Sequence, residues 1–501
     1  MPTIIDPKVE VIDYGPKVVL SNGEIISSDE IVYGAAGITF KGMKALDELF
    51  ESRRGGKDVG EKMTKNIIKS AGAGHASMAT TPGMWVVMQG NCSKLVDSIF
   101  TTAKFSSSLM PSGRRVGIDV DQIVVPRRIH ENPEAERLYM DASVLNIQTY
   151  EGLIKRGVEK QQASKIVQYG HSGGGLIYMP LETLVYFSKL LESEFCEMPR
   201  EGREIISQLE DFVHEHEMGI TYEARKNAPR TGCPNPDIFH TRYNLADDLR
   251  NECRDNVNPV LISVGGVGYS MERDSRIENY LKLREQVAKS PEGIKENWKI
   301  LLRELDEIIQ DYNNSASVTT FANSPWRVWG EVKRHRTLSQ TAESVYHAAS
   351  RALKIVRDYK INTRNLFLEE KFSQVVSIPQ SVAKDHDNLR AWLGAFSNSM
   401  NIYDEIIEMG IPMSDAIAVV PRGLKLGIVK RFDLYNMATG YLPLRLCSTA
   451  EPEMRETSEK ERDLILIGAY EAGSNPQVDY AIEKIDEVNN FLKQGMYENI
   501  S

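Results

Sequence analysis

The chain has 501 residues, 26% of them charged and 41% hydrophobic, so it is long enough for two or three globular domains. Its formal net charge of −10 argues against general affinity for nucleic acid. Five scattered cysteines without a Cys-x-x-Cys pair favour a reducing compartment and argue against a zinc site or a disulfide framework. With no signal-like N-terminus and no apolar run of about 18 residues, the expectation is a cytoplasmic protein without a membrane span.

Apolar periodicity and turn residues predict a mixture of strands and helices. Short apolar runs bounded by glycine and asparagine predict strands between Val9 and Ile26. The charged stretch 276–313 has helical periodicity, and the Ser290-Pro291 pair divides it into two helices. Further helices are predicted over 383–410, 452–470 and 475–493. The fold class predicted from this mixture is α/β (α+β).

Two pairs of similar segments indicate an internal repeat. In the first half, Thr102 precedes Ser112 by ten positions, and in the second half Arg334 precedes Ser344 by ten positions. Segment 163–170 is similar to segment 416–423 at an offset of 253 (416 − 163), and a proline pair, 199 and 452, shares that offset. A repeat on this scale predicts two similar units in tandem. Chance similarity of two α/β stretches is the alternative.

Gly170-His-Ser172-Gly-Gly174 fits the Gly-x-Ser-x-Gly pattern of the nucleophile elbow in α/β-hydrolases. An elbow needs a strand before the serine and a helix after it, and Ile166-Val167 is a candidate strand. Against a helix, three consecutive glycines follow Ser172. A hydrolase with Ser172 as nucleophile is therefore a remote alternative. Segment 232–275 contains Cys-Pro-Asn-Pro and Gly-Gly-Val-Gly and is the predicted connection between the halves.

Arg334-His335-Arg336 places three ionisable donors in a row after an apolar stretch with two tryptophans. Arginine offers a planar fork for phosphate or carboxylate, and histidine can donate from one ring nitrogen and accept at the other. The row is thus a candidate anion site. Three adjacent basic residues can equally form a solvated helix face.

The row followed by seven residues and Ser344 resembles the signature of the flavin-dependent thymidylate synthases, the ThyX family. Two later segments strengthen the resemblance. Ala416-Ile417-Ala-Val-Val-Pro421 is similar to the family's Ala-Arg-x-Val-Leu-Pro segment, and Leu444-Arg445-Leu446 is similar to its Leu-Arg-Leu segment. In the first half, Gly74-His75-Ala-Ser77 and Ser112-Gly-Arg114 resemble further family segments.

The resemblance implies an enzyme that converts dUMP to dTMP by methylating C5 of the pyrimidine. It implies FAD as cofactor, with methylene-tetrahydrofolate and NADPH as co-substrates, and neither a protein nucleophile nor a metal. The cofactor carries the difficult chemistry, and the protein orients it. The family builds its site between the subunits of a homotetramer.

The resemblance also implies roles for individual residues at the matching positions. The residues expected to contact the cofactor are Arg334, His335, Arg336 and His75. Those expected to bind the nucleotide are Ser344, Arg445, Ser112, Arg114 and Arg422, with Arg445 reaching the nucleotide from the neighbouring unit.

The chain departs from the family pattern at several of these positions. Tyr346 stands where the family has the arginine of Ser-x-Arg, Ile417 replaces the arginine of the Ala-Arg segment, and Thr449 replaces a histidine. Arg422, just past Pro421, is a candidate substitute. In the first half the Arg-His-Arg row has become Thr102-Ala-Lys, and Glu192 stands where the second half has Arg445. A carboxylate there would repel a phosphate by about 1 kcal/mol.

The losses in the two halves are partly complementary, because the first half keeps Ser112 and Arg114 while the second keeps Arg334 to Arg336 and Arg445. The prediction is a degenerate ThyX-like domain over 1–240, a connection over 241–275 and a ThyX-like domain over 276–501. Two chains would form a homodimer that imitates the family tetramer, with two working sites. The alternatives are a first half that serves only as a scaffold, and a non-catalytic or substrate-diverged flavin- or nucleotide-binding paralogue.

Overall fold

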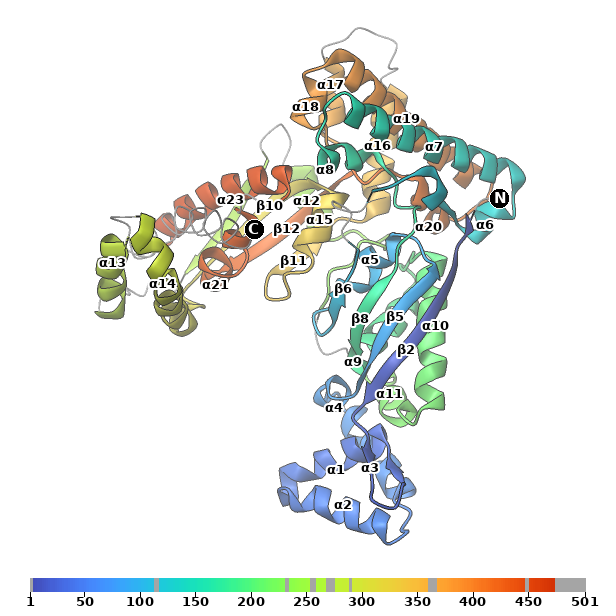
Figure 1. Ribbon diagram of the computed structural model, residues 1–501, viewed down its shortest axis with the longest axis vertical. Helices are drawn as coiled ribbons and strands as arrows, with labels where there is room; N and C mark the ends of the chain where they lie inside the picture. The colour runs from blue at the N-terminus through green and yellow to red at the C-terminus, as the bar shows by residue number, and fades with distance from the viewer. Residues whose placement is uncertain are drawn as a thin grey trace. The chain divides into compact units, whose positions relative to one another are not determined.

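A computed structural model describes residues 3–111, 117–229, 234–252, 258–266, 275–287, 291–358, 367–446 and 450–473. The chain divides into two compact units that are each discontinuous in sequence. Unit 1 comprises Met1–Arg156, Ile166–Arg242 and Ala391–Pro421. Unit 2 comprises Gly157–Lys165, Tyr243–Arg390 and Arg422–Ser501. Each unit is built on one four-stranded sheet (Figure 1).

The sheet of unit 1 is antiparallel throughout, in the order β2-β5-β8-β6. Its strands are β2 Asp6–Gly15, β5 Gly83–Asn91, β8 Gly175–Pro180 and β6 Ser107–Leu109. Helices α9 Leu181–Leu191, α10 Arg200–Glu215 and α11 Gly219–Lys226 accompany this sheet (Figure 1). Gln208 of α10 fixes the helix to β2, because its side-chain oxygen accepts from the Val9 amide at 3.1 Å and its amide donates to the Pro7 carbonyl at 3.0 Å.

A helical insert separates β2 from β5. Its helices are α1 Ser28–Lys41, α2 Lys44–Arg54, α3 Gly60–Ala71 and α4 Ser77–Thr80. The sequence starts α1 with a capping box, in which Ser27 accepts from the Glu30 amide and Glu30 accepts from the Ser27 amide. Gly34 lets α2 approach closely, since a Cβ there would lie 2.8 Å from the Leu49 side chain.

The sheet of unit 2 is also antiparallel, in the order β9-β10-β12-β11. Its strands are β9 Val260–Gly266, β10 Ala316–Pro325, β12 Lys425–Asp433 and β11 Ser339–Ala342. Alternate residues face opposite sides. Phe321 and Val429 pack with α12 Leu245–Glu252 on one side, whereas Thr320 reaches α23 Pro452–Glu471 on the other.

The two sheets have the same strand order when each is numbered along the chain: first, second, fourth, third. Helices α13 Ser275–Val287 and α14 Pro291–Tyr312 follow the first strand of unit 2, where unit 1 has its helical insert. Helices α7 Pro133–Lys155 and α19 His386–Glu408 both have 23 residues and begin 253 positions apart. Asn146 of α7 donates to Ser399 of α19 at 2.9 Å, and these two residues are also 253 positions apart.

The remaining elements are short or connect those above. The strands are β1 Thr3–Ile4, β3 Val18–Val19, β4 Ile25–Ile26 and β7 Val124–Val125. The helices are α5 Leu95–Phe100, α6 Arg127–His130, α8 Lys160–Ala163, α15 Trp326–Val332, α16 Val345–Asp358, α17 Phe367–Ser373, α18 Gln380–Ala383, α20 Met413–Ala416, α21 Leu434–Ala438 and α22 Leu442–Arg445.

The predicted mixed fold class is confirmed, as are the strands between Val9 and Ile26 and the paired helices of 276–313. The helix predicted over 475–493 lies outside the described residues. Segment 241–275 is more than a connection, because it supplies α12 and the edge strand β9 to unit 2. The division into two copies stays a prediction. In the described part of the chain, no helix is both long and apolar enough to cross a membrane.

Candidate active site

The Arg-His-Arg row lies in a tight turn of unit 2 between α15 and β11. Two fully buried tryptophans, Trp326 and Trp329, anchor α15 in the core. The turn is closed by backbone hydrogen bonds from the His335 amide to the Val332 carbonyl at 3.0 Å and from the Leu338 amide to the His335 carbonyl at 3.2 Å. Because Leu338 is also fully buried, both ends of the turn are fixed by packing.

The three side chains of the row have different environments. Arg334 is exposed, whereas His335 and Arg336 are half-buried. The Arg336 guanidinium donates to the Lys333 carbonyl at 3.2 Å, and burial followed by the charge of Arg334 lowers its pKa. The ammonium group of the buried Lys333 lies 5.0 Å from the centroid of the Trp329 ring. The turn is therefore strongly cationic, with its charge spread from solvent to core.

His335 joins a chain of polar contacts with Arg445 and Glu331. Arg445, at the end of α22, donates from Nε to His335 Nε2 at 2.9 Å and has a second nitrogen 2.6 Å from the same atom. Its remaining terminal nitrogen pairs with the Glu331 carboxylate at 2.9 Å. The structure thus brings together two predicted site residues that are 110 positions apart.

His335 must be neutral to accept these hydrogen bonds. Burial, the charge of Arg445 and then the charges of Arg336 and Lys430 lower its pKa to about 3. With Nε2 accepting from Arg445, the proton of the neutral ring is on Nδ1. His335 therefore presents one N–H donor rather than a full charge.

A second ion pair lies behind the imidazole. Lys430 of β12 pairs with Glu461 of α23 at 2.6 Å, and both side chains are essentially inaccessible to solvent. Thr320 donates to Glu461 at 2.9 Å. Burial acts to lower the pKa of Lys430, but the Glu461 carboxylate outweighs it and the pKa is raised, so the lysine stays charged. The Tyr441 ring stands edge-on to His335, with centroids 4.8 Å apart, and completes the back wall.

Ser344 and its neighbour Glu343 are buried at the start of α16. The Ser344 hydroxyl accepts from the Tyr346 amide at 3.2 Å, as a helix cap does. Glu343 accepts from the Gly427 amide at 2.7 Å and pairs with Arg351. The motif serine thus has a structural contact, and its role at a nucleotide stays a prediction.

Arg422 lies in a different buried cluster of unit 2. Its guanidinium is 1% exposed and donates to the Ser164 carbonyl at 2.8 Å. Close by in sequence, Lys165 pairs with Glu451 at 2.8 Å and with Glu453 at 2.5 Å. Its hydrogen bond therefore places Arg422 against residues 164–165, and its expected part in phosphate binding stays a prediction.

The hydrolase alternative fails on local geometry. Ile166 ends a 3-10 helix over Ser164–Ile166 and is not part of a strand, and the chain after Ser172 enters strand β8 instead of a helix. Gly173 is close-packed, since a Cβ there would meet the Ser93 carbonyl oxygen at 2.2 Å. A nucleophile elbow needs the opposite order, a strand followed by a helix. The glycines therefore serve the packing of this segment, and the Ser172 prediction is wrong.

Comparison with known proteins connects the turn to a family. The Thy1 family model, thymidylate synthase complementing protein, matches residues 313–466, a segment that holds β10, the Arg-His-Arg turn and Arg445. Flavin-dependent thymidylate synthases of Pyrococcus furiosus and Pyrococcus horikoshii are 28% and 32% identical over 130 residues, 26% of this chain and 46% of each relative. Residues 313–466 are therefore the part of the chain that is similar to the flavin-dependent thymidylate synthases. The chain spans less than half the length of these curated relatives.

The likeness to solved structures is weaker. A UMP/dUMP methylase, PolB from Streptomyces cacaoi bound with 5-Br dUMP, is 17% identical over 46% of this chain and 100% of its own, with a TM-score of 0.36. ThyX from Helicobacter pylori, complexed with FAD and dUMP, is 12% identical over 46% of this chain and 99% of its own, with a TM-score of 0.30.

The C-terminal end of the chain is similar to a different group. A family model for the T3SS EscN ATPase C-terminal domain matches residues 452–501, and a flagellum-specific ATP synthase of Buchnera aphidicola is 50% identical over 40 residues, 8% of this chain and 9% of that relative. Helix α23 begins this match, and residues 474–501 lie outside the described part. The ThyX-family match ends at residue 466, so the two overlap only along α23.

The first-half candidates of the ThyX-like pattern lie in unit 1. His75 is exposed in the turn before α4. Ser112 and Arg114 lie outside the described residues, so their part in a site stays a prediction. At the positions that the predicted repeat pairs with the Arg-His-Arg turn, Thr102 and Ala103 are buried, and the Thr102 hydroxyl donates to the Ile99 carbonyl at 3.0 Å. Unit 1 thus fills this turn with packing contacts.

Sequence reasoning missed the residues that hold the ThyX motif in place, namely Glu331, Lys430, Tyr441 and Glu461. A glutamate on the tryptophan-rich α15 and a lysine in the apolar strand β12 were the available signals, because buried charges occur almost only in pairs. Their partners are distant in sequence, so only the fold could identify them.

Proposed function

We propose that this protein is a flavin-dependent methyltransferase that converts dUMP to dTMP, with methylene-tetrahydrofolate as one-carbon donor and NADPH as reductant. The observation that carries the proposal is the contact of Arg445 with His335, since it brings together a residue that the ThyX resemblance assigns to the flavin and one that it assigns to the nucleotide. The relatives named for this reaction and the neighbours solved with FAD and dUMP support it.

The residues of the turn suit a ligand such as FAD. Arg334 and Arg336 supply guanidinium donors for phosphate and carbonyl oxygens, and neutral His335 supplies one N–H donor without adding charge. When bound, FAD would carry reducing equivalents from NADPH and take part in moving the one-carbon unit to the pyrimidine.

We propose that the side chains of this site bind and orient the ligands. Glu331 balances the charge of Arg445, and Arg445 holds His335 in one tautomer and one ring orientation. The buried pair of Lys430 and Glu461 fixes the wall against which Tyr441 and His335 pack. Such preorganisation is what a cofactor enzyme requires from its protein.

We further propose that the chain is a tandem duplication and that two chains form a homodimer which imitates the family tetramer, with one working site per chain. The shared strand order of the two sheets and the 253-residue spacing of α7 and α19 support the duplication. The split of motif residues between the halves supports the dimer. A molar mass equal to one chain in light scattering would contradict it.

The competing proposal is a flavin- or nucleotide-binding paralogue that has lost the reaction or changed its pyrimidine. It is favoured by Tyr346, which is buried where the motif has an arginine, and by Ile417, which is fully buried. Release of tritium from C5-labelled dUMP, with FAD, NADPH and methylene-tetrahydrofolate present, separates the two. We expect release by the wild-type protein and none by His335→Ala. Flavin retention without release would favour the paralogue.

A further inference from the structure

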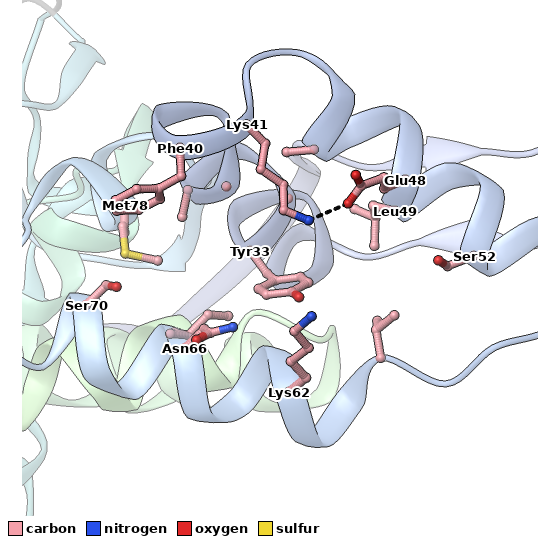
Figure 2. Close-up of a pocket in the computed structure, with 16 residues that line it drawn as sticks. Tyr33, Phe40, Lys41, Glu48, Leu49, Ser52, Lys62, Asn66, Ser70 and Met78 are labelled. Carbon is pink, nitrogen blue, oxygen red and sulfur yellow. Dashed lines mark hydrogen bonds and ion pairs between the residues drawn. The ribbon is translucent and has the colours of Figure 1, made fainter.

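The helical insert of unit 1 contains a cavity that the proposed reaction does not use. It has a volume of about 330 Å³ and lies among α1, α2, α3 and α4 (Figure 2). Ligand pockets for small molecules begin at about 300 Å³, so the cavity is large enough for a compact organic molecule. All of its lining residues belong to unit 1.

The floor of the cavity is apolar. Leu49 and Ile67 are buried beneath it, and Ala45 and Met78 add further apolar surface. Phe40 and Met78 line one end of the cavity (Figure 2), yet 88% of Phe40 is exposed to solvent. An aromatic ring that lines a cavity and is this exposed has apolar surface left to bury against a ligand.

The mouth of the cavity carries a net positive charge. Lys41 and Lys62 line it together with a single acidic residue, Glu48. Lys41 pairs with Glu48 at 2.6 Å, and both are exposed. Among the described residues, Lys62 has no ion pair, and it lines the cavity together with Tyr33 and with Asn66, which is one turn along α3 (Figure 2).

We propose that this cavity binds a small anionic amphiphile, with an aromatic or aliphatic body on the apolar floor and a single carboxylate or sulfonate at Lys62 and Asn66. The volume of the cavity limits the size of the ligand, and its apolar floor favours a ligand with an apolar body. Because the lining has one more lysine than carboxylate, it favours a ligand with a single negative charge. The site lies in the helical insert, so it is independent of the methyl transfer proposed for unit 2.

The test uses the full-length protein and the fluorescent anion 1-anilinonaphthalene-8-sulfonate, displaced by octanoate. We expect saturable fluorescence that octanoate reverses and that octyltrimethylammonium, which has the same chain and the opposite charge, does not. Lys62→Ala should weaken octanoate competition about fivefold, as loss of one partly exposed charge contact does. Lys69→Ala, on the same helix but outside the cavity lining, is the matched control and should change nothing.

A second variant keeps the proposal testable if the dye also binds elsewhere. Ala36→Trp places a large side chain in the cavity and should remove the octanoate-sensitive signal while the circular dichroism spectrum stays unchanged. If Ala36→Trp does not fold, the comparison of Lys62→Ala with Lys69→Ala in octanoate competition still tests the proposal. Equal displacement by the anion and the cation, or equal effects of the two lysine variants, would overturn the proposal.

Discussion

The predicted repeat pairs two segments that differ in content between the two units. In unit 2 it carries Arg334, His335 and Arg336, braced by Arg445 and Glu331. In unit 1 the corresponding turn is filled by the buried Thr102 and Ala103. The two sheets nevertheless have the same strand order. A sheet of this strand order is thus found with buried, uncharged residues at this position of the predicted repeat in unit 1 and with a cationic turn in unit 2.

The largest expected effect comes from the buried ion pair behind that turn. At an offset of 253 residues, unit 1 has Ile177 and Gln208 where unit 2 has Lys430 and Glu461. Lys430→Met leaves the Glu461 carboxylate buried without its cation and should lower the free energy of unfolding by about 3–5 kcal/mol. The double variant with Glu461→Gln, which imitates unit 1, should recover most of this loss in urea unfolding. If the single and the double variant are equally destabilised, the unpaired Glu461 carboxylate is not the cause of the lower stability.

Loss of the arginine that orients His335 should lower activity strongly, although less than loss of His335 itself. Arg445→Ala removes both hydrogen bonds to Nε2, so the ring loses its fixed orientation and dUMP-dependent tritium release should fall about 100-fold. The pKa of His335 should rise, because one of the charges that lower it is gone. NMR titration of the imidazole checks this directly. An unchanged rate together with an unchanged titration would contradict the assigned role.

The two units should also differ in cofactor affinity. Arg334→Ala removes an exposed guanidinium from the turn of unit 2 and should weaken FAD binding about tenfold, as the loss of one charge-assisted contact does. Lys104→Ala removes the one cation of the paired segment in unit 1, at the position of Arg336, and should leave FAD binding unaltered. Fluorescence quenching of FAD measures both. If both variants weaken FAD binding equally, the two units do not differ in their contribution to FAD affinity.

The smallest effects are opposite pH dependences of stability. The pKa of His335 is about 3 instead of 6.5, so the unfolded chain takes up the proton first and this residue destabilises the fold as pH falls from about 6.5 to 3. In unit 1, burial raises the pKa of Glu201 to about 7 from 4.5, so the folded chain takes up the proton first and stability is gained as pH falls from about 7 to 4.5.

Substitution separates the two contributions in thermal unfolding at several pH values. His335→Gln should lessen the loss of stability in acid, and Glu201→Gln should lessen the gain between neutral pH and pH 4.5. The two variants must shift the pH profile in opposite directions. Shifts in the same direction would contradict the burial of one or both groups.

Local patterns predicted the parts of this molecule that local forces determine. Helical periodicity and the Ser290-Pro291 start predicted the break between α13 and α14 within a few residues. The motif identified His335 and Arg445, which the fold brings into contact. Ile166, a residue of the candidate strand before Ser172, lies instead in a 3-10 helix, because a short apolar run does not distinguish the two.

Properties that depend on distant contacts could not be predicted. Residues 391–421 join unit 1 although they follow most of unit 2 in sequence, and no composition signal marks such an exchange. No sequence pattern distinguishes Glu331 from an ordinary helix residue, and only its ion pair with Arg445 places it in the site. The buried capping contact of Ser344 is likewise determined by the start of α16 and not by the motif spacing.

The most direct test of the central claim is the stoichiometry of FAD binding. Titration of the purified protein with FAD, followed by fluorescence quenching, should give one FAD per chain, and the double variant Arg334→Ala/Arg336→Ala should lose this binding. The Lys104→Ala control should retain it. No FAD binding by the wild-type chain, or full binding by the double variant, would contradict a cofactor site at the Arg-His-Arg turn of unit 2.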